Sequence, residues 1–435
     1  MKRAGAEAAG RFAAKGLGLA AQLATLALVA EALGARDFGR YSLVLAIAAV
    51  VAQLADFGTG RFQFRRAHRG SPAAMLAMWS LAFRLLGAGL LLPLLLFYAW
   101  RTGLPGPALA FGFVANILFQ FANLNRHLLL LDERVGAAIL VESAPALFFC
   151  AGIAACLAAS VALDVNGVLL LFLSAMAAGF ACSAASSGTA GAWVRGVAML
   201  WRTPARRVLA GVGILARRSS LIGVEIFLAA ASFNAPILIV AALDGGAATP
   251  QVALYQRILG LEVALLSVTV TARLKAYHDC GKLGVLDGRP ALASAVLVFA
   301  ANAAGLLLLA PLVQLLPESR DITLIGIALS LRPHLLLVAA VAACTAANLH
   351  CSMSALGGNW LWPRCLSVGA GLLATTAVAA SLVAKGAEPF AAVLQGSLIG
   401  QLTALTVLIA GVTREGGRIH LPWSLPWRSP AGVRA

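Results

Sequence analysis

Long apolar runs alternate with short charged turns along almost the whole chain. Twelve runs have approximate limits of 14–34, 41–60, 74–100, 108–131, 137–160, 166–190, 219–243, 252–272, 291–316, 334–356, 365–385 and 389–412. About 20 apolar residues are enough to cross a bilayer as a helix, and a helix satisfies its own backbone hydrogen bonds in lipid. The pattern therefore predicts an all-α integral membrane protein with about twelve transmembrane helices.

The composition excludes an ordinary water-soluble protein, because 61% of residues are hydrophobic, 11% are charged and the mean hydropathy is +0.89. The net charge of +16 does not indicate a nucleic-acid partner, since the Lys and Arg residues lie in short turns between apolar runs. The seven cysteines form no CxxC pair. We therefore expect small buried cysteines, and no metal site, cofactor or disulfide framework.

The basic residues predict the orientation of the chain. If the N-terminus is inside, 24 of the 33 Lys and Arg residues fall in inside segments, six fall outside and three lie within spans. Such an excess favours both termini in the cytoplasm. The first run also resembles a signal peptide, but Arg11 and Lys15 come late and a second span follows at once, so we expect an uncleaved span.

The longest connection, 191–218, divides the chain into an N-terminal six-helix lobe, 1–190, and a C-terminal six-helix lobe, 219–412, followed by a basic cytoplasmic tail, 413–435. Tyr41 and Tyr255, which each begin the second span of a lobe, are 214 residues apart. This spacing favours parallel repeats, whose substrate sites lie where the two halves meet.

The connection itself is basic, with apolar residues at helical spacing. Trp193, Val197, Leu200 and Trp201 recur on one face among several arginines that suit lipid headgroups. A cytoplasmic interfacial helix and a plain basic loop are both compatible with this pattern.

Three arginines fall within the spans. Arg84 lies about 15 Å into the third span. An arginine at that depth costs at least about 2.5–3.5 kcal/mol unless it faces a wet cavity, a substrate phosphate or a buried acid such as Glu262. Arg126 and Arg257 are shallower, and either can extend its side chain to the interface.

Other polar residues accompany these arginines within the spans. Four acids, Asp56, Glu142, Glu225 and Glu262, predict a cavity of mixed sign, although Asp56 lies near the inside end of its span, close to Arg61. The amides Asn116, Gln120 and Asn123 share one helix face, and Asn234 lies in the seventh span. Such amides most often form hydrogen bonds between helices. The alternative is that they line a cavity for a hydroxyl-rich substrate.

The stretch 33–66 carries a resemblance to a known family. It contains Leu-Gly at the end of one span, Asp-Phe-Gly-x-Tyr at 37–41 and Leu-Ala-Asp-Phe-Gly at 54–58. These motifs resemble the N-terminus of bacterial polysaccharide flippases, the O-antigen and exopolysaccharide transporters of the multidrug/oligosaccharidyl-lipid/polysaccharide flippase superfamily. The resemblance implies a two-lobed fold of the MATE and flippase type.

For function, the resemblance implies transport of an undecaprenyl-pyrophosphate-linked oligosaccharide across the bacterial inner membrane for O-antigen, capsule or exopolysaccharide synthesis. Expected partners are this lipid-linked oligosaccharide, membrane lipids, and the polymerase and ligase of the pathway. Cationic side chains line the central cavity of such flippases, a part that Arg84 and Arg257 could play, since arginine binds phosphate through a fork of donors.

The alternative is a cation-coupled multidrug exporter of the MATE type. The spans hold more acids than bases, and Asp56, Glu225 or Glu262 would then bind the coupling ion or a cationic drug. We do not expect an enzyme, because HExxH and GxSxG motifs are absent. The longest predicted outside loop, 317–333, also offers few ionisable residues.

Overall fold

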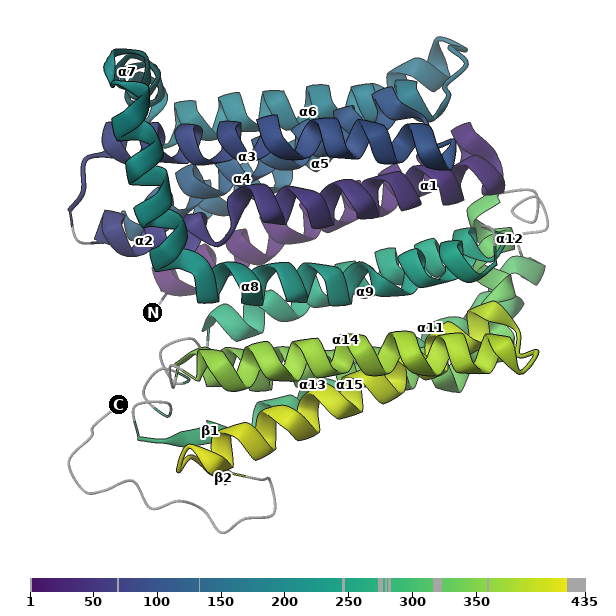
Figure 1. The fold of residues 1–435 in the computed structure, drawn as a ribbon. Coiled ribbons are helices and arrows are strands. Elements are labelled where there is room, and N and C mark those ends of the chain that lie inside the picture. The colour runs from purple at the N-terminus through teal and green to yellow at the C-terminus, as the bar shows by residue number, and fades with distance from the viewer. Residues whose placement is uncertain are drawn as a thin grey trace. The chain divides into compact units, whose positions relative to one another are not determined.

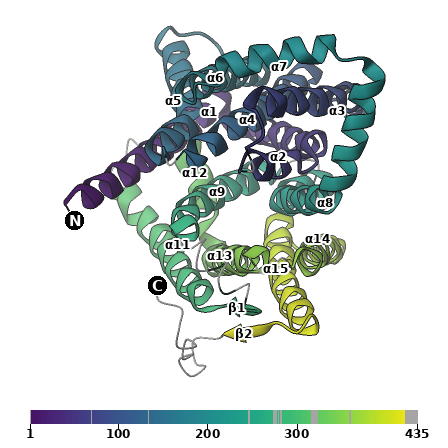
Figure 2. The ribbon, with the colours of Figure 1, turned by 90° about the vertical axis from the view of Figure 1, so that its left-hand side faces the viewer.

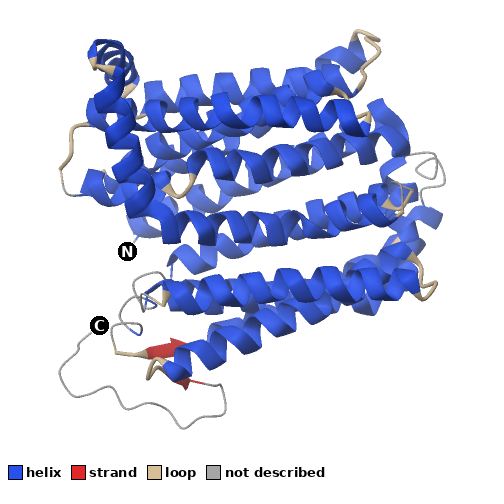
Figure 3. Cartoon of the chain, viewed as in Figure 1, coloured by secondary structure: helices blue, strands red, loops and turns tan. Residues whose placement is uncertain are grey.

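The computed structural model describes residues 2–68, 70–132, 134–244, 247–272, 283–315, 323–357 and 360–420, together with Tyr277 and Cys280. Nearly all of these residues are helical, with one pair of short strands (Figure 3). Within the described ranges nine helices are long and apolar enough to cross a membrane. The chain is therefore a multi-pass membrane protein of the all-α class.

Each of the twelve predicted spans is helical. The first eight helices are α1 (Lys2–Asp56), α2 (Thr59–His68), α3 (Ala73–Thr102), α4 (Gly106–Leu131), α5 (Val135–Ala158), α6 (Val165–Ser186), α7 (Ala190–Arg202) and α8 (Ala205–Leu243). The remaining elements are α9 (Thr249–Ala272), β1 (Val285–Asp287), α11 (Arg289–Leu315), α12 (Thr323–Ser330), the 3₁₀ turn η2 (Arg332–His334), α13 (Leu335–Gly357), α14 (Leu361–Ala384), α15 (Pro389–Arg414) and β2 (Arg418–His420).

Helix α1 contains the first two predicted spans. They are separated at Gly34, whose backbone has φ 70° and ψ 169° and interrupts the helix. Glycine adopts this conformation readily because it has no Cβ. The break expected between the first two apolar runs is thus a kink within one helix, and the second half of α1 extends to Asp56.

The contacts divide the chain into two compact units, Met1–Leu254 with Leu316–Ala328, and Tyr255–Leu315 with Leu329–Ala435. In the first unit α1 packs on α4 and α5, α4 packs on α6, and α3 packs on α7 (Figure 1). In the second unit α14 packs on α15, and α11 packs on α13. The boundary of these units lies within α9, and the two six-helix lobes remain a prediction.

Helix α7 occupies the connection for which the sequence left a helix and a loop open. Of its buried residues, Gly196 lies against Ala74, Ala77 and Met78 at the beginning of α3, beside which α7 lies in Figure 2. Trp193 packs against Phe121 of α4 and Phe180 of α6. Val194 and Trp201 on the other side are 70% and 85% exposed. One side of α7 therefore anchors the helix to the first unit and the other presents apolar side chains outward.

The strands were not expected from the sequence. β1 pairs in parallel with β2, with Val285 opposite Arg418 and Leu286 opposite Ile419. Leu286 is 1% exposed and packs in an apolar cluster with Leu408 and Val412. The strand β2 lies in the predicted basic tail, whose residues 421–435 are outside the described part, as are residues 317–322 of the predicted outside loop.

Candidate functional site

Arg84 and Asp56 form a buried ion pair in the first unit. Arg84 Nη2 donates to Asp56 Oδ1, and the two residues are 1% and 5% exposed. Arg84 also donates through Nε to Gln120 Oε1 at 3.3 Å and through Nη1 to Ser80 Oγ. All three guanidinium nitrogens therefore have protein acceptors. The expectation that a buried acid could compensate Arg84 is met by Asp56, and not by Glu262, which was given as an example of such an acid.

The carboxylate of Asp56 is held from the other side by the turn that follows it. Thr59 Oγ1 donates to Asp56 Oδ1 at 2.9 Å, and the Gly60 amide donates to Oδ2 at 3.4 Å. The sequence placed Asp56 close to Arg61, whereas its described partners are Arg84, Thr59 and Gly60. Charge-assisted bonds of this kind are about twice as strong as neutral ones, so this turn is firmly positioned.

The turn contains the Asp-Phe-Gly sequence at 56–58, which is part of the stretch that resembles polysaccharide flippases. The geometry of the turn explains why a glycine stands in this motif. Phe57 and Gly58 both have positive φ, of 42° and 75°. A Cβ on Gly58 would lie 2.6 Å from the backbone nitrogen of Gly223 on α8. Glycine at 58 thus allows both the left-handed turn and the close approach of α8.

A second ion pair joins α4 and α5. Arg126 Nη2 lies 3.0 Å from Glu142 Oε2, and the two side chains are 33% and 26% exposed. This pair is more exposed to solvent than the pair of Arg84 and Asp56, so water weakens the attraction between its charges. Two of the four predicted span acids are therefore paired with two of the three predicted span arginines.

The predicted amides are mostly engaged within or between helices. Gln120 Nε2 donates to the Ala52 carbonyl on α1 at 2.9 Å. Asn116 and Asn234 each donate to a carbonyl of their own helix at 2.8 Å. Asn123 is half-buried on α4. Of this set, only Gln120 shares a cluster with Arg84 and Asp56.

The remaining predicted residues lie on α8 and α9. Glu225 is 0% exposed in α8 of the first unit. In the second unit Arg257 is half-buried on α9. Glu262 Oε1 on the same helix accepts from Asn302 Nδ2 on α11 at 2.6 Å, whereas its buried Oε2 has no hydrogen-bond partner in the described part of the chain.

Two buried polar networks were missed by the sequence reasoning. Asn125 Oδ1 accepts from Thr189 Oγ1 and from Trp193 Nε1, both at 2.8 Å, and so ties α7 to α4. In the second unit Tyr277 Oη and Ser294 Oγ bind the two ring nitrogens of His350, at 2.5 and 2.7 Å. The residues of each network are far apart in sequence and follow no local spacing that could have revealed them.

The first unit also contains an apolar groove of about 1250 Å³, formed by the second half of α1, the end of α3 and the end of α8. Its apolar lining includes Leu43, Ile47, Val50, Val51 and Leu54 of α1, Leu91, Leu94, Leu95 and Leu104 of α3 and the following turn, and Leu238, Ala241 and Ala242 of α8. Its polar lining is confined to one end, where Arg36, Arg40, Tyr98, Thr102, Asp244 and Thr249 lie.

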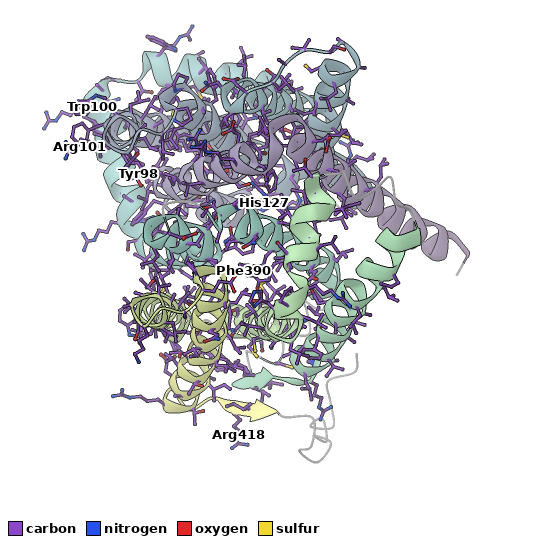
Figure 4. The ribbon with its side chains drawn as sticks, turned by 90° about the vertical axis from the view of Figure 1, so that its right-hand side faces the viewer. Tyr98, Trp100, Arg101, His127, Phe390 and Arg418 are labelled. Carbon is purple, nitrogen blue, oxygen red and sulfur yellow. The ribbon has the colours of Figure 1, made fainter. Side chains whose placement is uncertain are left out.

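The polar end of this groove has the character of a membrane interface. Tyr98, Trp100 and Arg101 lie close together at the edge of the first unit (Figure 4). Tyr98 and Trp100 are 47% and 73% exposed. Tyr and Trp gather at the headgroup level of membranes, where an amphipathic ring suits both phases. The groove thus extends from an interfacial mouth into the apolar part of the bundle.

Comparison with known proteins shows the fold. No protein-family profile and no curated protein matches the chain. Among solved structures, a MOP-superfamily transporter from Pyrococcus furiosus, described as having a binding pocket of reversed polarity, aligns with 16% identity and a TM-score of 0.59 over 93% of this chain and 94% of its own. The lipid II flippase MurJ in an inward closed conformation aligns with 12% identity and a TM-score of 0.59 over 94% and 89%.

An inward-facing multidrug resistance transporter of the MATE family aligns with 18% identity and a TM-score of 0.56 over 92% of this chain and 94% of its own. These identities are low, and the likeness is one of fold. The expectation of an all-α membrane fold of the MATE and flippase type is confirmed. The chain is similar in fold to the transporters and flippases of the MOP superfamily.

Proposed function

We propose that the chain is a flippase that moves an undecaprenyl-pyrophosphate-linked oligosaccharide from the cytoplasmic to the periplasmic leaflet of the bacterial inner membrane. It would serve O-antigen, capsule or exopolysaccharide synthesis, together with the polymerase and ligase of the pathway. Both termini would lie in the cytoplasm. The fold, which is shared with a lipid II flippase, and the resemblance of 33–66 to polysaccharide flippases support this proposal.

The observation that carries the proposal is the pairing of two of the predicted span acids of the first unit. Asp56 is bound by Arg84, and Glu142 is bound by Arg126. A carboxylate that is held by an arginine can bind a drug cation or a coupling ion only if the ion pair breaks, which is costly when both groups are buried. This arrangement favours a substrate other than a cation.

The pairing also changes the role that we assign to each arginine. Because Arg84 donates from all three guanidinium nitrogens to protein groups, we assign it to holding α1, α3 and α4 together. Arg257 on α9 and Arg126 on α4 stay candidates for contact with pyrophosphate.

A cation-coupled multidrug exporter remains the second candidate, on the basis of Glu262. One of its carboxylate oxygens is bound by Asn302 and the other is buried without a described partner. A buried acid of this kind is suited to binding a proton or a metal cation. In a flippase the same acid could couple transport to an ion, so Glu262 does not by itself identify the substrate.

Deletion of the gene in the host separates the two functions. We expect loss of the mature surface or secreted glycan, with unchanged tolerance of cationic drugs, and restoration of the glycan by the wild-type chain. Intact glycan with hypersensitivity to cationic drugs would contradict the proposal and support the exporter.

A further inference from the structure

We propose that the apolar groove of the first unit binds the hydrocarbon chain of a polyprenyl phosphate lipid, with the phosphate beside Arg36 at the mouth. The inference rests on the proposed function and assigns part of its substrate to a place in the fold. It is carried by the lining of the groove, its length and the charges at its mouth.

The lining is apolar except at the mouth. On α1 the residues Leu43, Ile47, Val50 and Leu54 recur at intervals of three or four and so share one face. Leu91 and Leu95 of α3 have the same spacing. Every charged or polar lining residue lies toward the beginning of this half of α1, the ends of α3 and α8, or the first residue of α9. A ligand that fills the groove must therefore be a long hydrocarbon with its polar group at one end.

The length of the groove favours a hydrocarbon chain that is longer than the thickness of one leaflet. From Arg40 to Leu54 the helix rises about 21 Å at about 1.5 Å per residue. The hydrocarbon core of a bilayer is about 30 Å thick, so a leaflet contributes about 15 Å. The volume of about 1250 Å³ also exceeds the roughly 300–1,000 Å³ of pockets for drug-sized ligands. A polyprenyl chain meets these dimensions better than the acyl chains of a phospholipid.

The mouth holds one arginine that lies outside the described ion pairs. Arg40 Nη1 is paired with Asp37 Oδ1 at 3.2 Å. The carboxylate of Asp244 accepts the Ala248 amide at 2.7 Å, a hydrogen bond that fixes it in the turn between α8 and α9 without neutralising its charge. Arg36 is exposed and lines the mouth, and among the described residues it forms no ion pair. A phosphate at the interface would be bound by this guanidinium fork.

The groove is separate from the buried ion pair. It ends at Leu54, two residues before Asp56, and neither Asp56 nor Arg84 lines it. With the predicted orientation, the mouth faces the periplasm. A lipid bound here would have completed its crossing, and its chain would have stayed in an apolar environment throughout.

Binding by the purified full-length protein tests this inference. We would reconstitute the protein in phosphatidylcholine nanodiscs, add undecaprenyl phosphate, and measure the retained lipid by native mass spectrometry. Ile47→Trp should reduce retention at least about tenfold, because an indole in the groove overpacks the site of the chain. Leu90→Trp is the matched control, since Leu90 is on α3, is 72% exposed and does not line the groove. It should retain the lipid as the wild type does.

The charge at the mouth is tested separately. Arg36→Gln should weaken retention of undecaprenyl phosphate about fivefold and leave retention of the uncharged polyprenol unchanged, as expected for one arginine near a lipid phosphate. Dioleoyl phosphatidic acid, which has a phosphate but shorter chains, should compete poorly. Equal competition by this lipid would overturn the inference in favour of an ordinary phospholipid site. Unchanged retention by a folded Ile47→Trp protein would overturn it as well.

These outcomes are distinct from failure of the proposed function. If deletion leaves the glycan intact while Ile47→Trp abolishes lipid retention, the flippase proposal fails and the groove still binds a polyprenyl lipid. If deletion removes the glycan while Ile47→Trp and Arg36→Gln retain the lipid normally, the function stands and the groove assignment fails.

Discussion

The guanidinium of Arg84 on α3 donates to the carboxylate of Asp56 at the end of α1, with the two residues 1% and 5% exposed. The Arg84 guanidinium also lies 5.1 Å from the centre of the Phe121 ring, which packs edge-on against Trp193 of α7. The ion pair is therefore part of a continuous buried cluster that joins α1, α3, α4 and α7.

Loss of Arg84 should destabilise the first unit. Arg84→Ala leaves Asp56 charged and buried, which costs about 3–5 kcal/mol of unfolding free energy for pairs of this kind. The double variant with Asp56→Ala should recover most of the loss, because no unpaired charge remains. Thermal unfolding and membrane abundance of the purified variants are the measurements.

The pair of Arg126 and Glu142 is the matched control. Arg126→Ala should cost about 0–1 kcal/mol, since its side chain is 33% exposed and water replaces its partner. If Arg84→Ala is as stable and abundant as Arg126→Ala yet exports no glycan, Arg84 acts on the substrate and its assignment to packing is wrong.

Replacement of Gly58 should show that the turn after Asp56 is sterically constrained. Gly58→Ala places a Cβ at φ 75°, 2.6 Å from the nitrogen of Gly223. The left-handed conformation alone costs about 1–2 kcal/mol, and the close contact adds to it. Gly89→Ala, in a helix with no atom within 4 Å of the new Cβ, should be neutral or stabilise by about 0.5–1 kcal/mol. Equal melting temperatures for the two variants would contradict the constraint.

The N-terminus of α6 provides a test by pH. Asp164 Oδ1 accepts the Gly167 amide at 2.7 Å, and this bond lowers the pKa of the carboxyl below its ordinary value of 3.8. The charged carboxylate of Asp164 therefore stabilises the folded state at pH values above its pKa in the unfolded chain. This stabilisation is lost as the pH falls through the lower pKa that the carboxyl has in the folded protein. Asp164→Ala should cost about 1 kcal/mol at pH 7.

The control at this position is Asp164→Asn, because asparagine is an equally good cap but does not titrate. The variant should have the melting temperature of the wild type at pH 7. As the pH is lowered, it should lose less stability than the wild type, because it lacks the contribution from protonation of Asp164. The measurement is thermal unfolding between pH 3 and 7. An Asp164→Ala protein as stable as Asp164→Asn at pH 7 would exclude a capping role.

The predicted topology is tested by reporter fusions. Fusions after Asp132 and after Gly284 should report a cytoplasmic position, and a fusion after Thr249 should report a periplasmic one. The physical reason is the concentration of Lys and Arg in the inside segments. Exchange of these readings would place the mouth of the groove on the cytoplasmic side.

The helices could be predicted from the sequence, because the length of each apolar run is determined by the thickness of the membrane. Arg84 could be identified as buried by the same reasoning, since its depth follows from its position in the third span. Its partner could not, because depth does not say which helices touch. Glu262 was the example given for a deep acid, whereas Asp56, near the end of its span, reaches Arg84 through the packing of α1 on α3.

Other features depend on contacts that leave no local pattern. The residues of β1 and β2 pair across more than a hundred positions, and three residues are too few for a strand signal. The groove arises only when faces of α1, α3 and α8 are brought together, although each face follows an ordinary helical spacing. Conversely, the sequence showed Gly58 as part of a motif. Why a glycine is needed there could be explained only from the structure, in which the backbone of Gly223 lies close to it.

Translocation by the purified protein tests the central claim most directly. Proteoliposomes would carry an undecaprenyl-pyrophosphate-linked oligosaccharide, and an added lectin would report the fraction of sugar on the outer leaflet. We predict that the wild-type chain raises this fraction well above that of empty liposomes, and that Ile47→Trp does so less than Leu90→Trp. A fraction equal to that of empty liposomes, with cation-dependent export of a cationic dye from the same vesicles, would contradict the flippase account.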